Sequence, residues 1–390
     1  MTDTPRHFGP EIQGAIYLRG LGGAKPDIPT SFAGLEAAAQ QRMSPEAWAY
    51  TAGSAGLESA AEANRAAFSR FPIAPRMLGG AAQRDLGCEI FGARAVAPIM
   101  SCPVGVLEMM HPEADLAVAR AMSRLKLPMI ISSQASKPME EIAKANGDGD
   151  RFYQLYWGKK DEVAESFVKR AEQIGAKAIF LTLDTTALGW RPRDLNLGYM
   201  PFLRGQGIAQ YTSDPEFRKL LPQTPEENPQ AAAITFTQIF SDPGLDWARI
   251  AKIKSWTKLP VVLKGIQRPD DAVKAVSEGY DGIMVSNHGG RQVDGGIGAL
   301  EALPGVVAAV KGKIPVFMDS GIRCGADIFK ALALGAKAVG IGRPYVYGLA
   351  LNGDQGVQTV MEYLLSELDL TMGLNGCRTP ADVTRDLLAG

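Results

Sequence analysis

The chain has 390 residues, of which 46% are hydrophobic and 21% charged, and 41 basic side chains nearly balance 42 acidic ones. This balance gives no electrostatic basis for binding nucleic acid or an anionic membrane, and the apolar content excludes disorder of the whole chain. No uncharged apolar run reaches the roughly 18 residues that span a bilayer, and the first thirty residues lack the apolar core of a secretory signal. Four scattered cysteines without C-x-x-C spacing predict neither disulfides nor a metal site. We therefore expect a cytoplasmic protein.

The first 94 residues predict an arm followed by a layer of helices. Residues 1–30 are rich in Pro and Gly and are expected to form an extended arm. Helical patterns follow at about 31–41, 44–53 and 58–71, the first capped by Ser31 and the second ended by Gly53 in a left-handed conformation. We expect this N-terminal part, residues 1–94, to pack on the domain that follows.

From about residue 95, short β-branched runs alternate with amphipathic helical segments. Strands alternating with helices predict right-handed βαβ units and a parallel sheet. Eight such units favour a closed (β/α)8 TIM barrel over residues 95–390, and the alternative is an open, doubly wound sheet. The expected strands are 96–102, 129–133, 152–156, 178–184, 260–264, 282–287, 315–319 and 338–342.

One connection is much longer than the others. The fourth expected strand ends at Asp184 and the fifth begins near Pro260, which leaves an insertion at about 192–243. Loops of this length in compact domains are usually lids, binding segments or disordered. We expect a lid over the barrel mouth, and the alternative is a solvated decoration.

In a TIM barrel the active site lies at the carboxyl ends of the strands. Here each of the eight expected strands ends in polar, charged or glycine residues that suit a binding site. These ends lie at 102–105, 132–134, 154–156, 182–184 with Arg191 just beyond, 264–265, 286–291, 319–323 and 340–343.

The last two strand ends repeat one arrangement, in which small residues precede an arginine. Residues 319–323 read Asp-Ser-Gly-Ile-Arg, and residues 340–343 read Gly-Ile-Gly-Arg. Small residues let the backbone approach an oxyanion, and arginine binds phosphate through two hydrogen bonds. The pattern predicts a phosphate site, and the alternative is tight-turn glycines beside surface arginines.

His288 is the best placed of the three histidines. It follows an apolar strand, and Asp184 at another strand end is the expected partner that fixes its tautomer. His7 lies in the arm and His111 at a helix start, without comparable neighbours. We therefore expect His288 to be a general base.

Further polar side chains are expected around this base. Arg191 and Arg291 suit an anionic substrate such as a carboxylate, and Tyr50 and Tyr156 can donate hydroxyl groups to it. Lys264 ends a buried strand, where it could stabilise negative charge on a flavin or else extend from the strand end into solvent.

The run Ser-Asn-His-Gly-Gly-Arg-Gln at 286–292 resembles the signature of the FMN-dependent α-hydroxy-acid oxidases and dehydrogenases. The resemblance covers roughly residues 30–380. The segments 20–23, 189–194 and 201–205 and the residue Gly105 resemble the lactate 2-monooxygenase branch of that family. Gln134 departs from the oxidases that carry an aromatic residue there. Further matching positions, in the family's order, are Tyr50, Tyr156, Asp184, Arg191, Lys264, His288 and Arg291.

The resemblance implies a role for each of these residues. His288 is the base, supported by Asp184, while Tyr156 bonds the substrate hydroxyl and Lys264 favours the reduced flavin anion. The carboxylate of the substrate is held by Tyr50, Arg191 and Arg291. FMN is held by Pro103, Val104, Gly105, Ser132, Gln154, Thr182, Lys264, Ser286, Asp319, Gly321, Arg323, Gly342 and Arg343.

The reaction implied is oxidation of a small L-2-hydroxy acid, most simply lactate, with O2. If the oxo acid stays bound, lactate yields acetate, CO2 and water; if it leaves first, the products are pyruvate and H2O2. The residues are also compatible with a dehydrogenase that uses another electron acceptor and with a non-redox phosphate-binding barrel. The family also implies a homo-tetramer or homo-octamer.

Overall fold

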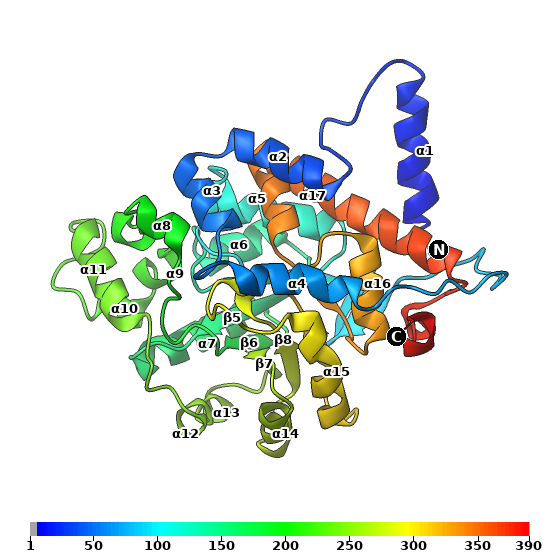
Figure 1. Ribbon diagram of the computed structural model, residues 1–390. Coiled ribbons are helices and arrows are strands. Elements are labelled where there is room, and N and C mark those ends of the chain that lie inside the picture. The colour runs from blue at the N-terminus through cyan, green and yellow to red at the C-terminus, as the bar shows by residue number, and fades with distance from the viewer. Residues whose placement is uncertain (1–5, 390) are drawn as a thin grey trace.

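Eight parallel strands close into a barrel in the computed structural model, which describes residues 6–389 (Figure 1). Each strand lies within or overlaps one of the eight expected runs, so the prediction of a (β/α)8 barrel is confirmed and the open sheet is excluded. In order around the barrel the strands are β10 (Val339–Ile341), β3 (Ile99–Ser101), β4 (Met129–Ile131), β5 (Arg151–Tyr156), β6 (Ile179–Thr182), β7 (Val261–Ile266), β8 (Gly282–Val285) and β9 (Val316–Met318).

The barrel interior is filled by side chains from alternate positions of the strands, as the two-residue period of a β-strand requires. Phe152, Phe180 and Phe317 form its centre, with ring centroids 5.5 and 6.1 Å apart along this series. A hairpin of β1 (Cys88–Ile90) and β2 (Ala93–Ala95), which the sequence patterns did not reveal, packs Phe91 against Phe317. The hairpin thereby fills the amino-terminal end of the barrel, so that a binding site can form only at the carboxyl end.

Amphipathic helices surround the strands (Figure 1). The helix α7, for example, buries an apolar face with Val163, Phe167 and Val168 and contacts β5. The helices are α5 (Ala114–Arg124), α6 (Met139–Asn146), α7 (Asp161–Gln173), α12 (Trp247–Ile250), α13 (Ile253–Trp256), α14 (Pro269–Ser277), α15 (Ala299–Val310), α16 (Gly325–Ala333) and α17 (Arg343–Leu374), with single turns η1 (Leu107–Met109), η3 (His288–Gly290), η4 (Pro380–Asp382) and η5 (Arg385–Leu387). No helix within residues 6–389 is long and apolar enough to cross a membrane.

Three N-terminal helices occupy the expected segments: α2 (Phe32–Arg42), α3 (Pro45–Ala52) and α4 (Ser59–Ser69). Ser31 caps α2 by accepting a hydrogen bond from the Gly34 amide, as predicted. The prediction that Gly53 is left-handed is wrong, because its φ is −64°. Glycine is required there by space, since a Cβ would lie 2.3 Å from the Ala49 carbonyl oxygen.

The prediction of an extended arm is also wrong for residues 8–20, which form a helix; residues 1–5 lie outside the described part of the chain. A helix, α1 (Phe8–Gly20), stands against the end of α17 (Figure 1). The Gly9 amide donates to the Asp369 carboxylate at 2.8 Å, and Phe8 is buried. Pro10 lies in the first turn, where its missing N–H removes no hydrogen bond. The helix α1 is thus stabilised by contacts with α17, which is far away in the sequence.

The long insertion between β6 and β7 is folded. Its aromatic side chains form a core in which the rings of Tyr211 and Phe236 are 4.7 Å apart and those of Phe202 and Phe236 are 5.2 Å apart. Figure 1 shows its short helices grouped on one side of the barrel. They are α8 (Pro192–Asn196), η2 (Pro201–Arg204), α9 (Ala209–Thr212), α10 (Pro215–Arg218) and α11 (Pro229–Ile239).

Candidate active site

The carboxyl ends of the strands open into a cavity. Most of the predicted site residues line it: Tyr50, Pro103, Val104, Gly105, Tyr156, Thr182, Arg191, Lys264, His288, Arg291, Asp319, Gly321, Arg323, Gly342 and Arg343. The remaining ones lie directly behind the wall and form hydrogen bonds with wall residues or with each other: Ser132, Gln154, Asp184 and Ser286.

His288 sits in the turn η3 with a positive φ of 58°, and its amide donates to the Ser286 hydroxyl. Its Nδ1 lies 2.8 Å from the Asp184 carboxylate and 3.2 Å from the Thr185 hydroxyl. On the other side of the ring, Nε2 lies 3.3 Å from the Tyr156 hydroxyl. The carboxylate therefore favours the tautomer with the proton on Nδ1, which leaves the Nε2 lone pair on the side of the tyrosine.

Burial and charge set the protonation of this pair in opposite directions. Burial alone would raise the pKa of Asp184, but the charges of His288 and Lys264 outweigh it and hold that pKa at about 2. Burial lowers the pKa of His288, and Asp184 offsets only part of this effect. An ionised carboxylate beside a neutral imidazole is the state that a general base needs at neutral pH.

Two guanidinium groups lie beside the imidazole. Arg191 donates to the Arg291 carbonyl at 3.1 Å and to the Gln292 side chain at 2.8 Å. Arg291 donates to the carbonyls of Gly53 and Tyr50, with its guanidinium carbon 4.8 Å from the centre of the Tyr50 ring. Burial and the neighbouring Arg291 lower the pKa of Arg191 to about 10. Within residues 6–389 neither arginine forms an ion pair, so the two cations suit an anionic ligand.

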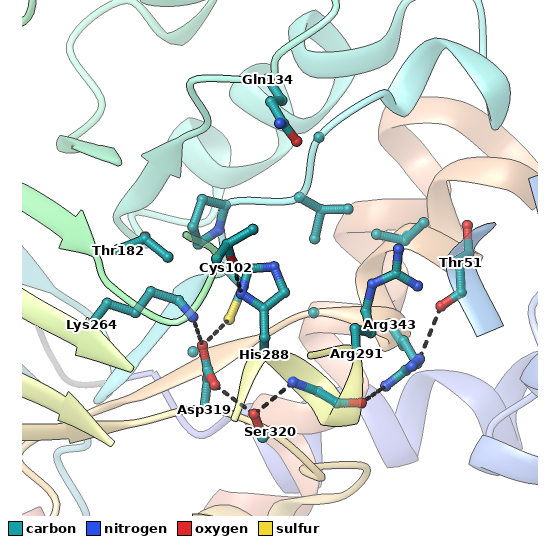
Figure 2. A pocket seen from close by; sticks show the side chains of 18 of the residues that line it. Thr51, Cys102, Gln134, Thr182, Lys264, His288, Arg291, Asp319, Ser320 and Arg343 are labelled. Carbon is teal, nitrogen blue, oxygen red and sulfur yellow. Dashed lines mark hydrogen bonds and ion pairs between the residues drawn. The ribbon is translucent and has the colours of Figure 1, made fainter. Parts of the chain in front are cut away.

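Lys264 projects from β7 into the wall of the cavity. Its Nζ lies 3.0 Å from the Asp319 carboxylate (Figure 2) and donates to the Ser286 hydroxyl at 2.8 Å. Burial lowers the pKa of Lys264, but Asp319 and Asp184 reverse the effect and raise it. A permanent cation therefore lies at this wall.

The other end of the cavity carries two further cations. Arg343 donates to the carbonyls of Thr51 at 2.9 Å and Gly289 at 3.0 Å (Figure 2), and burial lowers its pKa to about 9. Arg323 donates to the Ile322 carbonyl and lies over the Phe32 ring at 4.7 Å. In the described part of the chain neither has a carboxylate partner within ion-pair distance.

The backbone at this end is open to a ligand. Gly321 has a φ of 90°, a conformation that favours glycine. A Cβ on Gly342 would meet only the Cys102 Cβ, at 4.0 Å, so the peptide borders free space. This open peptide, beside two guanidinium groups that lack a carboxylate partner in the described residues, is well suited to a phosphate.

Comparison with known proteins identifies the family. The sequence pattern of the FMN-dependent dehydrogenase family matches residues 39–390. The chain belongs to this family. An FMN-dependent alpha-hydroxy acid dehydrogenase of Schizosaccharomyces pombe is 43% identical over 96% of this chain and 94% of its own length. An L-lactate oxidase of Lysinibacillus sphaericus is 41% identical over 93% of both chains.

Comparison with solved structures supports the same family. A crystal structure of mandelate oxidase with (S)-4-hydroxymandelic acid superposes with a TM-score of 0.83 at 37% identity, covering 93% of this chain and 98% of the other. The protein is an FMN-dependent α-hydroxy-acid oxidoreductase, so a non-redox phosphate-binding barrel is excluded.

The residues of the cavity fit FMN at both of its ends. The Gln154 amide nitrogen and the Thr182 hydroxyl are buried without a hydrogen-bond partner in residues 6–389, beside the cation of Lys264. Such orphaned groups match the polar edge of a flavin ring. The phosphate matches the unpaired cations of Arg323 and Arg343.

Several wall residues were missed by sequence reasoning. Thr185 follows Asp184 directly and could have been found as part of the same strand end. Thr51, Leu188 and Phe240 also line the cavity. They come from a helix, a loop and the end of the insertion, where no local pattern marks a residue that faces a site.

Proposed function

We propose that this enzyme oxidises a small L-2-hydroxy acid, lactate in the simplest case, with His288 as the general base. The observation that carries the proposal is the His288 Nε2, which shares the cavity wall with the Tyr156 hydroxyl 3.3 Å away and is backed by Asp184. Arg191, Arg291 and the Tyr50 hydroxyl bind the substrate carboxylate.

The proton of the substrate passes to this base. Tyr156 bonds the substrate hydroxyl, and neutral His288 accepts the proton at Nε2. Asp184 stabilises the resulting imidazolium through Nδ1–H. FMN supplies the acceptor for the two electrons that leave the substrate.

The cofactor is held by residues of two kinds in this proposal. Lys264 provides a cation at the flavin end, while Arg323 and Arg343 neutralise the phosphate. The other residues that hold the cofactor are Pro103, Val104, Gly105, Ser132, Gln154, Thr182, Ser286, Asp319, Gly321 and Gly342.

For the reaction with O2 we propose that the oxo acid is retained and decarboxylated. Pyruvate and H2O2 then give acetate, CO2 and water, so that lactate and O2 are fully accounted for. The insertion supports retention, because Phe202 and Phe240 form part of the cavity wall. The Gly207 amide anchors it by donating to the Glu108 carboxylate at 2.7 Å. This arrangement suits a lid that delays product release.

A second candidate is the simple oxidase, in which pyruvate leaves before H2O2 can react with it. The similarity to an L-lactate oxidase favours this outcome, and the similarity to fungal dehydrogenases keeps another electron acceptor open.

Product analysis separates these outcomes. The holoenzyme is incubated with L-lactate under air, and O2 uptake, acetate, pyruvate and H2O2 are measured in one sample. The proposal predicts one acetate per O2 consumed with little free H2O2. Stoichiometric pyruvate and H2O2 would establish the oxidase, and slow O2 uptake with fast reduction of an artificial acceptor would establish the dehydrogenase.

We also propose a homo-oligomer, a tetramer or an octamer, in the cytoplasm. Tyr17 and Leu18 on α1 and Leu21 directly after it are 68%, 69% and 86% exposed, and this apolar surface suits a subunit contact. In this proposal residues 1–94 form an N-terminal helical part that packs on the barrel domain, residues 95–390. Light scattering on the purified protein tests the oligomeric state, and a monomeric mass would refute it.

A further inference from the structure

Gln134 follows the end of β4 and lines the cavity, although it is only 6% exposed (Figure 2). Its side-chain nitrogen is buried and has no hydrogen-bond partner within residues 6–389. Buried polar groups are nearly always paired, because an unmade hydrogen bond costs free energy. The unpaired amide therefore indicates a ligand group.

The other unpaired groups around the cavity have assignments. Those of Gln154 and Thr182 suit the flavin, and the Asp184 oxygen belongs to the pair with the base. Thr51 belongs to the phosphate end, because its carbonyl accepts a hydrogen bond from Arg343. Gln134 is left for the substrate.

The backbone of Gln134 is held by three segments. Its amide donates to the Ser132 hydroxyl at 3.0 Å, and its carbonyl accepts from the Val106 amide at 2.9 Å. A Cβ on Gly207, in the insertion, would lie 3.1 Å from the same carbonyl, so these chains are in close contact. A Cβ on Gly105 would lie 2.8 Å from the Gln134 Cβ, so glycine there leaves room for this side chain. The amide is thus presented from a fixed backbone.

Aromatic rings connect this amide with the catalytic pair. The Tyr156 ring meets the edge of Phe240 with centroids 5.5 Å apart, and Phe240 is 6.0 Å from Phe202. Phe202 belongs to the same part of the insertion as Gly207, which contacts Gln134. Tyr156, Phe240, Phe202 and Gln134 all line the same cavity, so a substrate side chain that extends away from Tyr156 has apolar rings and the Gln134 amide within that cavity.

We infer that Gln134 selects 2-hydroxy acids whose side chain carries a hydroxyl group. A glutamine amide offers both a donor and an acceptor, and a hydroxyl matches either one. The methyl group of lactate leaves the amide unpaired, so lactate is a substrate that does not use this contact. The inference rests on the proposed function, since it places the substrate carboxylate and hydroxyl as described above.

Two pairs of substrates of nearly equal size test it. L-Glycerate is compared with L-2-hydroxybutyrate, and L-2,4-dihydroxybutyrate with L-2-hydroxyvalerate; in each pair a hydroxyl replaces a methyl group. For each substrate kcat/KM is measured on the holoenzyme and on Gln134→Met, which keeps the length of the side chain. Gln41→Met, on the exposed side of α2, is the matched control.

The expected result is a ratio of hydroxylated to alkyl substrate that falls roughly 3- to 10-fold in Gln134→Met in at least one pair, and is unchanged in Gln41→Met. Equal ratios in wild type and Gln134→Met for both pairs would overturn the inference. If Gln134→Met does not fold, Gln134→Leu replaces it. If neither variant folds, the wild-type enzyme alone decides: a preference above about 10-fold for the alkyl substrate in both pairs overturns the inference. If no 2-hydroxy acid reduces the flavin at all, the proposed function has failed instead.

Discussion

Replacing Arg323 by Met should weaken FMN binding without lowering the stability of the apoprotein. Within residues 6–389 the guanidinium makes one hydrogen bond, to the carbonyl of the preceding residue Ile322, and it lies over the Phe32 ring. Burial lowers its pKa, which means that the folded chain disfavours the charged form. Methionine keeps the contact with Phe32 and removes that unfavourable charge.

The magnitudes follow from these contacts. In the apoprotein the lost hydrogen bond and the removed buried charge oppose each other, so stability should change by less than about 1 kcal/mol. A hydrogen bond to a charged group contributes about 1.5–3 kcal/mol, so the dissociation constant for FMN should rise roughly 10- to 150-fold. At saturating FMN the holoprotein loses that same amount of stability.

The assay is a titration of apoprotein with FMN, followed by flavin fluorescence, together with chemical denaturation of both forms. Arg94→Met is the control, because Arg94 is exposed on β2 at the opposite end of the barrel. An unchanged FMN affinity in Arg323→Met, or equal destabilisation of apoprotein and holoprotein, would refute a phosphate-binding role.

Two further predictions concern the substrate end of the cavity. Asp184 raises the pKa of His288 against the effect of burial. Asp184→Asn should therefore slow flavin reduction and shift the acidic limb of the pH–rate profile to lower pH. Stopped-flow rates between about pH 5 and 9 test this, and a shift to higher pH would contradict it. Arg291→Met should lower kcat/KM for lactate roughly 10- to 150-fold through loss of the bond to the carboxylate. Arg193→Met, which removes an exposed ion pair with Glu58 in the same region, should change it less than about 3-fold; equal effects of the two variants would argue against a carboxylate clamp.

The barrel and the residues at its mouth could be predicted because parallel topology converts sequence order into spatial proximity. Lys264 lies near the end of β7, and Asp184 and His288 follow β6 and β8. Closure of the sheet brings these strand ends together. Strands buried on both faces appear as short apolar runs, so each strand end can be recognised where the run gives way to polar or glycine residues.

Features that depend on distant partners could not be predicted. The helix α1 is stabilised by Asp369, some 360 residues away, and its Pro and Gly content suggested an arm instead. The β1–β2 hairpin consists of three-residue strands, too short to show a period. Gly53 suggested a left-handed helix end, but the close approach of the Ala49 carbonyl is what requires glycine there.

The substrate side of the cavity was also beyond sequence reasoning. Phe240 ends an insertion whose path is set by packing among its own aromatic rings. The unpaired state of the Gln134 amide becomes evident only once every neighbouring donor and acceptor has been placed.

The most direct test of the account is anaerobic reduction of the flavin by substrate. L-Lactate is mixed with the holoprotein in the absence of O2, and the visible absorbance of FMN is followed in wild type and in His288→Ala, both with their FMN content measured beforehand. The account predicts rapid bleaching in the wild type and none on the same timescale in the variant, which retains its FMN. Bleaching of His288→Ala at the wild-type rate would contradict the assignment of His288 as the base.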